Sequence, residues 1–226
     1  MVNLTKIYTR VGDDGTTALG DFSRTSKTDP RLQAYADANE ANAAIGVAVT
    51  SGGLRDDVIE TLTRIQNDLF DVGADLCTPL QTVYEYPPLR VQAEWIDELE
   101  ADCDRYLAEV EPLRSFILPS GTPGSAQLHL ATTVVRRAER SAWAALEAYG
   151  DAPGTAKGQG GINVLTAKYL NRLSDLLFIL ARIANLEIGG DVLWQPGGGR
   201  RQAPVRRRRG PAPAAQVADD PRTDDD

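Results

Sequence analysis

The segment 163–186 is apolar around nearly its whole circumference, and this constrains the fold more than any other stretch. Its apolar residues recur every three or four positions, which is the period of an α-helix. They are Leu165, Leu170, Leu173, Leu176, Leu177, Phe178, Ile179, Leu180 and Ile183. A helix of this kind is buried on most of its sides. The rest of the chain must therefore supply the helices that surround it.

Four other segments have the pattern of such helices. Apolar residues recur at helical spacing in residues 32–50, 56–77, 91–110 and 125–149. Residues 115–121 form a short extended piece, and residues 149–161 form a loop because they contain five glycines and a proline. Five helices joined by modest loops predict an all-α fold, a five-helix up-and-down bundle.

The two ends of the chain differ in composition from this bundle. Residues 1–31 are polar and rich in glycine and hydroxyl groups, which predicts an irregular N-terminal arm that belongs to the same domain. The predicted bundle covers residues 32–190. Residues 191–226 form a C-terminal extension, and the arginine, proline, alanine and acidic residues of 200–226 are typical of disordered chain.

Arginines gather on the fourth predicted helix, in the run Arg136-Arg137-Ala138-Glu139-Arg140. Arg136 and Arg140 are four residues apart and share a helix face, where like charges repel by some tenths of a kcal/mol. A guanidinium fork matches phosphate oxygens, so a bound anion would explain the cluster. The alternative is an exposed, solvated helix face, which is where most charge runs lie.

The N-terminal arm has the ingredients of a second anion site. Gly12 and Gly15 allow backbone conformations that expose consecutive N–H groups. It is not a Walker A loop, because Asp21 stands where that motif has lysine. A mobile arm without a ligand is the alternative. A triphosphate would satisfy both the arm and the arginine helix.

A polar stripe crosses the apolar fifth helix. Lys168, Asn171, Asp175 and Arg182 fall at helical spacing along one side. Each such group costs about 1–3 kcal/mol if it is buried without a partner. We expect the partners to come from the arginine helix or a bound ligand, or from an internal lattice of salt bridges.

Other features limit the function. The net charge of −8 argues against nucleic acid as the main partner. Cys77 and Cys103 suit neither a disulfide framework nor a zinc site, and the single His129 excludes a ferritin-type di-iron site, so we expect a packing histidine with a satisfied ring. No leader pattern and no apolar run of about 20 residues is present, which predicts a cytoplasmic protein without a membrane partner.

Three stretches, in this order along the chain, resemble the PduO-type ATP:cob(I)alamin (corrinoid) adenosyltransferases. They are residues 5–15 with Lys27; Arg136-Arg137-Ala138-Glu139-Arg140; and residues 169–175 with Leu177, Phe178, Ala181 and Arg182. The resemblance covers roughly residues 5–190, and three motifs in order are far more specific than any one of them.

The resemblance implies an enzyme that transfers the 5′-deoxyadenosyl group of ATP to the cobalt of cob(I)alamin and releases triphosphate. It implies that Phe116 lies against the corrinoid and displaces the lower axial base, and that Arg140 stabilises the leaving triphosphate. It also implies that Asn171 lies beside the nucleotide and its Mg²⁺, and that no other side chain binds the Mg²⁺ directly. The implied ATP-binding residues are Thr9, Arg10, Val11, Gly12, Thr17, Ala18, Lys27, Arg136, Arg137, Glu139, Arg140 and Asn171.

This chemistry fits a chain with one histidine. No proton moves at the reacting centre, so the protein must align carbon with cobalt and stabilise the charge on the triphosphate. An apolar wall near cobalt would exclude water and the lower ligand. The alternatives are a non-catalytic ATP and cobalamin binder, either a sensor or a chaperone, and a nucleic-acid or scaffold protein acting through residues 200–209.

The resemblance also implies partners. They are two further copies of the chain in a homotrimer with active sites between subunits, a flavin-type reductase that supplies cob(I)alamin, and an adenosylcobalamin-dependent enzyme that receives the product. Members commonly pair an aspartate of the first helix with an arginine one turn before the double arginine, across the subunit boundary. Asn39 and Thr132 stand at these positions, which predicts a neutral contact.

Overall fold

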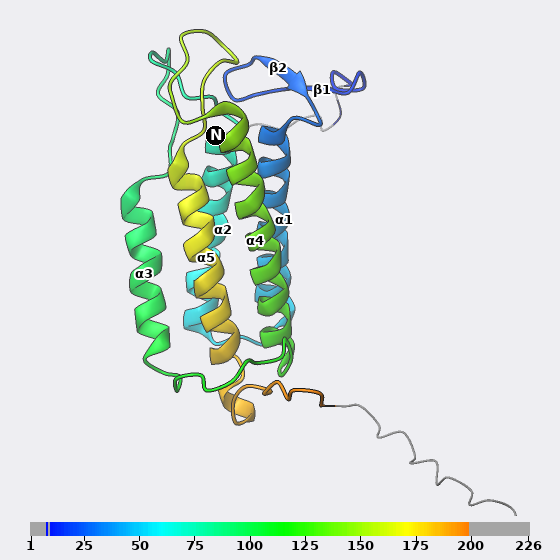
Figure 1. Cartoon of the computed structure of the whole chain (residues 1–226), viewed down its shortest axis with the longest axis vertical. Coiled ribbons are helices and arrows are strands. Elements are labelled where there is room, and N and C mark those ends of the chain that lie inside the picture. Colours follow the sequence, from blue (N-terminus) through cyan, green and yellow to red (C-terminus); the bar gives the residue numbers. More distant parts are fainter. Residues whose placement is uncertain (1–7, 9, 199–226) are drawn as a thin grey trace, which may run out of the picture. The chain divides into compact units, whose positions relative to one another are not determined.

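The structure is a computed structural model that describes residue 8 and residues 10–198. The chain divides into two compact units, Met1–Trp194 and Gln195–Asp226. The first unit contains five α-helices, as predicted: α1 (Pro30–Ser51), α2 (Asp56–Leu76), α3 (Ala93–Leu107), α4 (Pro123–Tyr149) and α5 (Val164–Ile183). A short 3₁₀ helix, η1 (Leu186–Ile188), follows α5. The predicted all-α, five-helix bundle is confirmed (Figure 1).

Capping residues set where two of the helices begin. The side chain of Asp29 accepts a hydrogen bond from the N–H of Arg31, and Pro30 takes the first position of α1. Thr122 caps α4 in the same way through the N–H of Ser125, again before a proline. Proline suits this position because its fixed φ is helical and no N–H is needed there. Both helices therefore begin two residues before the predicted starts.

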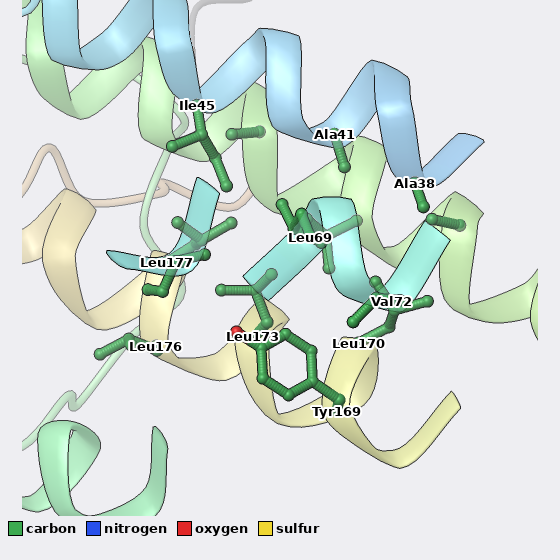
Figure 2. Packing of buried hydrophobic residues seen from close by; sticks show 14 of the residues in the cluster. Ala38, Ala41, Ile45, Leu69, Val72, Tyr169, Leu170, Leu173, Leu176 and Leu177 are labelled. Carbon is green, nitrogen blue, oxygen red and sulfur yellow. The ribbon is translucent and has the colours of Figure 1, made fainter. Parts of the chain in front are cut away.

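α5 is covered on most of its circumference, as its composition predicts. It packs against α4, α3 and α2, while α1 packs against α4 and α2. Figure 2 shows side chains of α1, α2 and α5 pointing toward one another, with Ala38 and Ala41 opposite larger groups such as Leu69 and Leu173. The small alanines of α1 let its backbone approach its neighbours closely, which is how interiors reach their high packing density.

The arm predicted to be irregular contains a small antiparallel hairpin. Strands β1 (Thr16–Ala18) and β2 (Arg24–Ser26) pair with Thr16 opposite Ser26. β-Branched threonines in both strands favour extended backbone. The turn between them includes Phe22 at a φ of 63°. Three-residue strands rich in polar residues give too weak an alternation for sequence reasoning to detect.

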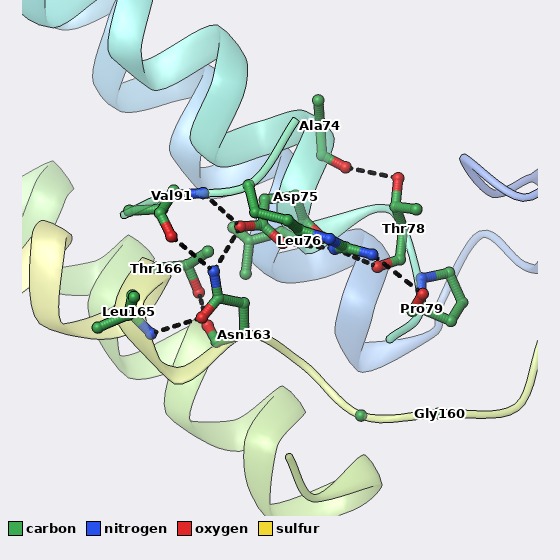
Figure 3. Close-up of polar contacts among 12 residues, drawn as sticks. Ala74, Asp75, Leu76, Thr78, Pro79, Val91, Gly160, Asn163, Leu165 and Thr166 are labelled. Carbon is green, nitrogen blue, oxygen red and sulfur yellow. Dashed lines mark hydrogen bonds and ion pairs between the residues drawn. The ribbon is translucent and has the colours of Figure 1, made fainter. Parts of the chain in front are cut away.

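A buried carboxylate ties together the end of the bundle nearest the hairpin. Asp75, at the end of α2, is fully buried. It accepts hydrogen bonds from the Nη1 of Arg90 at 2.5 Å, the N–H of Val91 at 2.8 Å and the Nδ2 of Asn163 at 2.7 Å. Figure 3 shows Asp75 between Val91 and Asn163, with Thr78 and Pro79 beside it. These bonds hold the loop after α2 and the start of α5 to one point.

The remaining predictions about local structure have mixed outcomes. Residues 115–121 include the predicted extended piece, where Ile117 pairs with Leu193. His129 is buried with its ring edge-on to Phe178, but its Nε2 has no hydrogen-bond partner among the described residues, so the expectation of a satisfied ring was wrong. None of the helices described here is long and apolar enough to cross a membrane. The predicted tail from residue 199 onward lies outside the described residues, and the domain boundaries at 31 and 190 remain predictions.

Candidate functional site

Two of the three arginines on α4 have no carboxylate partner among the described residues. Arg136 and Arg140 are exposed. The Nε of Arg136 lies 3.5 Å from the Oγ of Ser174, and the Nη1 of Arg140 donates to the carbonyl oxygen of Arg136 at 3.4 Å. These long contacts leave most of the guanidinium N–H groups for a ligand.

Arg137 faces a different helix. It pairs with Glu40 and, at 3.5 Å, with Asp37, both on α1. The hydrogen bond to Glu40 raises the pKa of Arg137 above its ordinary value. Asp37 is buried and also accepts hydrogen bonds from Ser141 at 2.6 Å and Gln33 at 3.0 Å. In this chain, Arg137 therefore ties α4 to α1 and is not aligned with Arg136 and Arg140.

The ion pair between Asp37 and Arg137 can be compared with the neutral contact predicted for Asn39 and Thr132. The Oδ1 of Asn39 lies near Gly73, which is on α2. Thr132 is buried and donates to the carbonyl oxygen of Leu128 in its own helix. The acid–arginine link between α1 and α4 is instead made by Asp37 and Arg137 within one chain.

Glu139 connects the arginine helix to α5. Its Oε1 accepts hydrogen bonds from the Nδ2 of Asn171 at 3.2 Å and from the Nε1 of Trp143 at 3.3 Å. Two predicted site residues that lie 32 positions apart in the sequence thus meet on one surface. A groove of about 380 Å³ is lined by these three residues, Lys168 and neighbouring side chains of α3 and α5.

Two other members of the polar stripe on α5, Asp175 and Arg182, find structural partners. Asp175 pairs with Arg172 at 2.9 Å. Arg182 is buried and pairs with Asp191 at 2.9 Å, and it donates to the carbonyl oxygen of Glu111 at 2.6 Å. The stripe therefore combines both expected roles: Asn171 bonds to the arginine helix, whereas Asp175 and Arg182 belong to salt bridges that hold the bundle.

The predicted residues of the arm gather around one turn. Arg10 adopts a left-handed φ of 63°, and the N–H of Gly15 donates to the carbonyl oxygen of Gly12 at 3.2 Å. Lys27 lies over this turn, since a Cβ added to Gly12 would be 3.0 Å from its Nζ. Val11 is exposed and Thr17 and Ala18 lie in β1, while Thr9 lies outside the described residues.

Asp21 fastens the arm to two loops. Its Oδ2 accepts hydrogen bonds from the Nε2 of Gln81 at 3.0 Å and from the N–H of Gly158 at 2.7 Å. The N–H of Gly20 donates to the carbonyl oxygen of Cys77 at 2.9 Å. Both loops are the ones held at Asp75, so the buried carboxylate indirectly fixes the position of the arm.

Residues 10–31 of the arm make no hydrogen bond or ion pair with Arg136 or Arg140 of the same chain. The hairpin lies at the end of the bundle where α1 begins and α4 ends (Figure 1). Arg140 lies nine residues before Tyr149, the last residue of α4, which is about 14 Å along the helix axis. The hydrogen bonds of residues 10–31 lead to the loops, to α1 and to Tyr149 at the end of α4, and none of them leads to Arg136 or Arg140.

Phe116 is exposed at the other end of the bundle. Its side chain is 77% accessible, and its ring meets that of Trp194 edge-on with centroids 5.9 Å apart. The N–H of Trp194 donates to the carbonyl oxygen of Phe116 at 2.8 Å, which fixes the two segments together. Leu118 and Leu193 belong to the same two paired segments and are also exposed. The surface here is therefore apolar.

Sequence reasoning did not identify two aromatic residues of these surfaces. Trp194 lies at the boundary where the composition changes, and Trp143 lies one turn beyond Glu139 on α4. Trp143 could have been identified from the sequence, because it is a tryptophan at helical spacing from Glu139, a predicted ligand residue.

Comparisons with known proteins identify the family of this chain. A family model described as cobalamin adenosyltransferase matches residues 7–184. A corrinoid adenosyltransferase of Mycobacterium tuberculosis is 58% identical over 199 residues, covering 88% of this chain and 97% of the relative. A corrinoid adenosyltransferase of Bacillus subtilis is 38% identical over 195 residues, covering 84% of this chain and 92% of the relative.

A solved structure is also similar. It is a variant of the PduO-type ATP:corrinoid adenosyltransferase from Lactobacillus reuteri complexed with cobalamin and ATP. It matches with a TM-score of 0.74 and 32% identity, and the match covers 84% of this chain and all of that chain. The family model spans most of the sequence and the relatives match along nearly their full length, so this chain belongs to the cobalamin adenosyltransferase family.

Proposed function

We infer that the exposed face formed by α4 and α5 is where this chain carries out the reaction of its family. The chain is a transferase that moves the 5′-deoxyadenosyl group of ATP to the cobalt of a corrinoid, cob(I)alamin, and releases triphosphate. The main support for placing the active site on this face is the hydrogen bond between Glu139 and Asn171. This bond brings two predicted nucleotide-binding motifs to one surface, beside the unpaired Arg136 and Arg140.

The two unpaired arginines hold the triphosphate in this proposal. Negative charge grows on the triphosphate as its bond to C5′ breaks, and fixed guanidinium groups stabilise that charge without reorganisation. Arg140 and Arg136 suit this role because their N–H groups make only long contacts with the protein. Arg137 supports it at a distance by fixing α4 against α1.

The arm closes over the triphosphate from a neighbouring subunit. Its turn brings the Nζ of Lys27 close to Gly12, and Arg10 begins the same turn with a left-handed φ, which suits an anion. The separation of the arm from Arg140 along α4 supports an active site assembled between two copies of the chain, in the homotrimer that the family resemblance implies. Thr9, Val11, Thr17 and Ala18 would contact the nucleotide from the same arm.

The donor set around Asn171 suits Mg²⁺ held by the nucleotide. The described part of the chain contains no group of three or more histidine, cysteine, aspartate or glutamate side chains that could hold a metal ion. Mg²⁺ usually keeps several waters and is bound through substrate phosphates with few protein ligands. The Nδ2 of Asn171 donates to Glu139, which leaves its amide oxygen available to a water on the ion.

Phe116 supplies the apolar wall for the corrinoid. A phenylalanine ring that is 77% accessible costs free energy in water unless something apolar covers it. A corrinoid lying on Phe116 would cover it, and the ring would keep water and the lower axial base away from cobalt. Trp194, held edge-on to Phe116, extends this wall.

The partners remain as the sequence predicts them. A flavin-type reductase would supply cob(I)alamin, and direct transfer of the product to an adenosylcobalamin-dependent enzyme would keep the reactive cofactor out of solution. A cytoplasmic location is likewise a prediction.

An Arg140→Ala variant tests the phosphate role. Adenosylcobalamin formation from ATP and pre-reduced cob(I)alamin is followed by its absorbance spectrum. We expect kcat/KM to fall by at least about 100-fold, in line with the loss of one charge-stabilising donor in other active sites, with unchanged helix content by circular dichroism. Arg105→Ala, which removes an exposed arginine of α3, is the matched control and should change activity little. Near-normal activity of Arg140→Ala would remove Arg140 from the phosphate site.

A further inference from the structure

The groove beside Glu139 has the size of a small-molecule site. Its volume of about 380 Å³ falls within the range of roughly 300–1,000 Å³ that is usual for ligand pockets. Side chains of α3, α4 and α5 form its walls, including Ile96, Trp143 and Asn171. It therefore adjoins the proposed phosphate site and lies partly within the predicted nucleotide-binding motifs.

The charges of the groove balance one another. Glu100 and Glu139 face the groove together with Lys168 and Arg172, and Arg172 pairs with Glu100 at 3.0 Å. Two carboxylates and two cations give a formal sum of zero. A triphosphate gains more from the unpaired arginines of α4 than from this groove, whereas an uncharged base can enter the groove without meeting an uncompensated charge.

Trp143 presents an aromatic surface that is already oriented. Its side chain is 41% exposed although it lies on a helix whose inner face is well packed. Its Nε1–H donates to Glu139 at 3.3 Å, and the same carboxylate oxygen accepts from Asn171. This bond at the edge of the indole limits rotation of the ring, and the part of the ring that lines the groove can stack on another flat group. Stacking of a base on an aromatic side chain contributes about 1–3 kcal/mol.

We propose that Trp143 is a further substrate-binding residue whose indole ring stacks on the adenine of ATP in this groove. The proposal rests on the proposed function, since it needs the triphosphate to lie on Arg136 and Arg140. Glu139 then has two tasks. It orients Asn171 on the side of the triphosphate and Trp143 on the side of the base.

The test compares two ligands and two substitutions at Trp143 in the full-length chain. Dissociation constants for ATP and for inorganic tripolyphosphate are measured by titration calorimetry with Mg²⁺ and without corrinoid. Trp143→Leu should weaken ATP binding about tenfold, which corresponds to about 1.4 kcal/mol. Trp143→Phe, which keeps an aromatic ring but loses the N–H, should weaken it less than about threefold. Tripolyphosphate has no base, so its affinity should not change in either variant.

Each departure from this pattern has a defined meaning. If Trp143→Leu binds ATP as tightly as the parent chain, the stacking role is overturned. If Trp143→Leu loses affinity for ATP and tripolyphosphate equally, Trp143 acts on the fold of the site, and the stacking role is again overturned. Arg140→Ala, measured beside them, should lose affinity for both ligands. Unchanged affinities in Arg140→Ala would refute the proposed phosphate site, independently of the result at Trp143.

Discussion

Replacing Asp75 by alanine should both destabilise the fold and weaken the binding of ATP. Asp75 is fully buried, and its two carboxylate oxygens accept hydrogen bonds from Arg90, Val91 and Asn163. The substitution leaves three donors without this acceptor. It also leaves the charge of Arg90, whose side chain is only 14% exposed, without a counter-ion.

The size of the effect follows from these contacts. Removing one partner of a buried ion pair typically costs about 3–5 kcal/mol. The lower end applies here, because Arg90 keeps hydrogen bonds to the carbonyl oxygens of Thr78 and Pro79 and to the hydroxyl of Tyr84. A loss of about 3 kcal/mol should lower the melting temperature by roughly 6–12 °C in a chain of this length.

Urea unfolding followed by circular dichroism measures the loss. Glu60→Ala is the control, since Glu60 is an exposed acidic residue of the same helix and should change stability by less than about 0.5 kcal/mol. The double variant with Arg90→Ala should lose less than the sum of the two single losses, because the two groups interact directly. A loss below about 1 kcal/mol for Asp75→Ala, or strict additivity with Arg90→Ala, would refute the assignment of Asp75 as the centre of this network.

The same variant has a consequence for function. The loops that Asp75 holds also carry Cys77, Gln81 and Gly158, which bind the arm through Gly20 and Asp21. At a temperature where Asp75→Ala remains folded, we expect the KM for ATP to rise more than kcat falls. The arm would be less well placed to bind ATP, while the arginines of α4 would be unaffected.

Two further predictions concern Phe116 and His129. Phe116→Ala should slow adenosylation that starts from cob(II)alamin more than adenosylation that starts from pre-reduced cob(I)alamin, because the apolar wall assists the reduction step; equal losses in the two assays would contradict this role. Burial lowers the pKa of His129 below the ordinary value of 6.5, so the unfolded chain binds this proton at a higher pH than the folded chain does. Stability should therefore decline as the pH falls from about 6.5 through the folded-state pKa. His129→Phe should show a smaller decline in urea unfolding between pH 7.5 and 5, and an identical decline would exclude His129 as its source.

The helices could be predicted from the sequence because their signals are local. The apolar period of α5 and the alanine stripe of α1 depend on neighbours within a few turns. The errors at the starts of α1 and α4 came from Asp29-Pro30 and Thr122-Pro123, which are capping pairs that the apolar period does not include. The hairpin of β1 and β2 was missed because three-residue strands have almost no period to detect.

The arrangement of the site depends on contacts between distant segments, which a period cannot reveal. Arg136 and Arg137 are adjacent in the sequence and look equivalent, yet one helix position turns Arg137 toward Asp37 on α1 and leaves Arg136 exposed. Similarly, Lys168 and Arg182 lie on one predicted stripe. Only Arg182 is buried and paired with Asp191, since a loop after α5 returns to cover that end of the helix.

The geometry of a single chain also explains why motif order alone could not define the active site. α4 carries the unpaired arginines near its middle, the arm lies beyond one end of α4, and Phe116 lies before the other end. The folded backbone of one chain keeps these three elements apart, and the hydrogen bonds of Asp21 hold the arm where it is. A nucleotide that contacts both the arm and the unpaired arginines needs either the arm of another copy or an arm that leaves the partners of Asp21. The bonds at Asp21 and Asp75 oppose the second route, which supports the proposed assembly of the site between subunits.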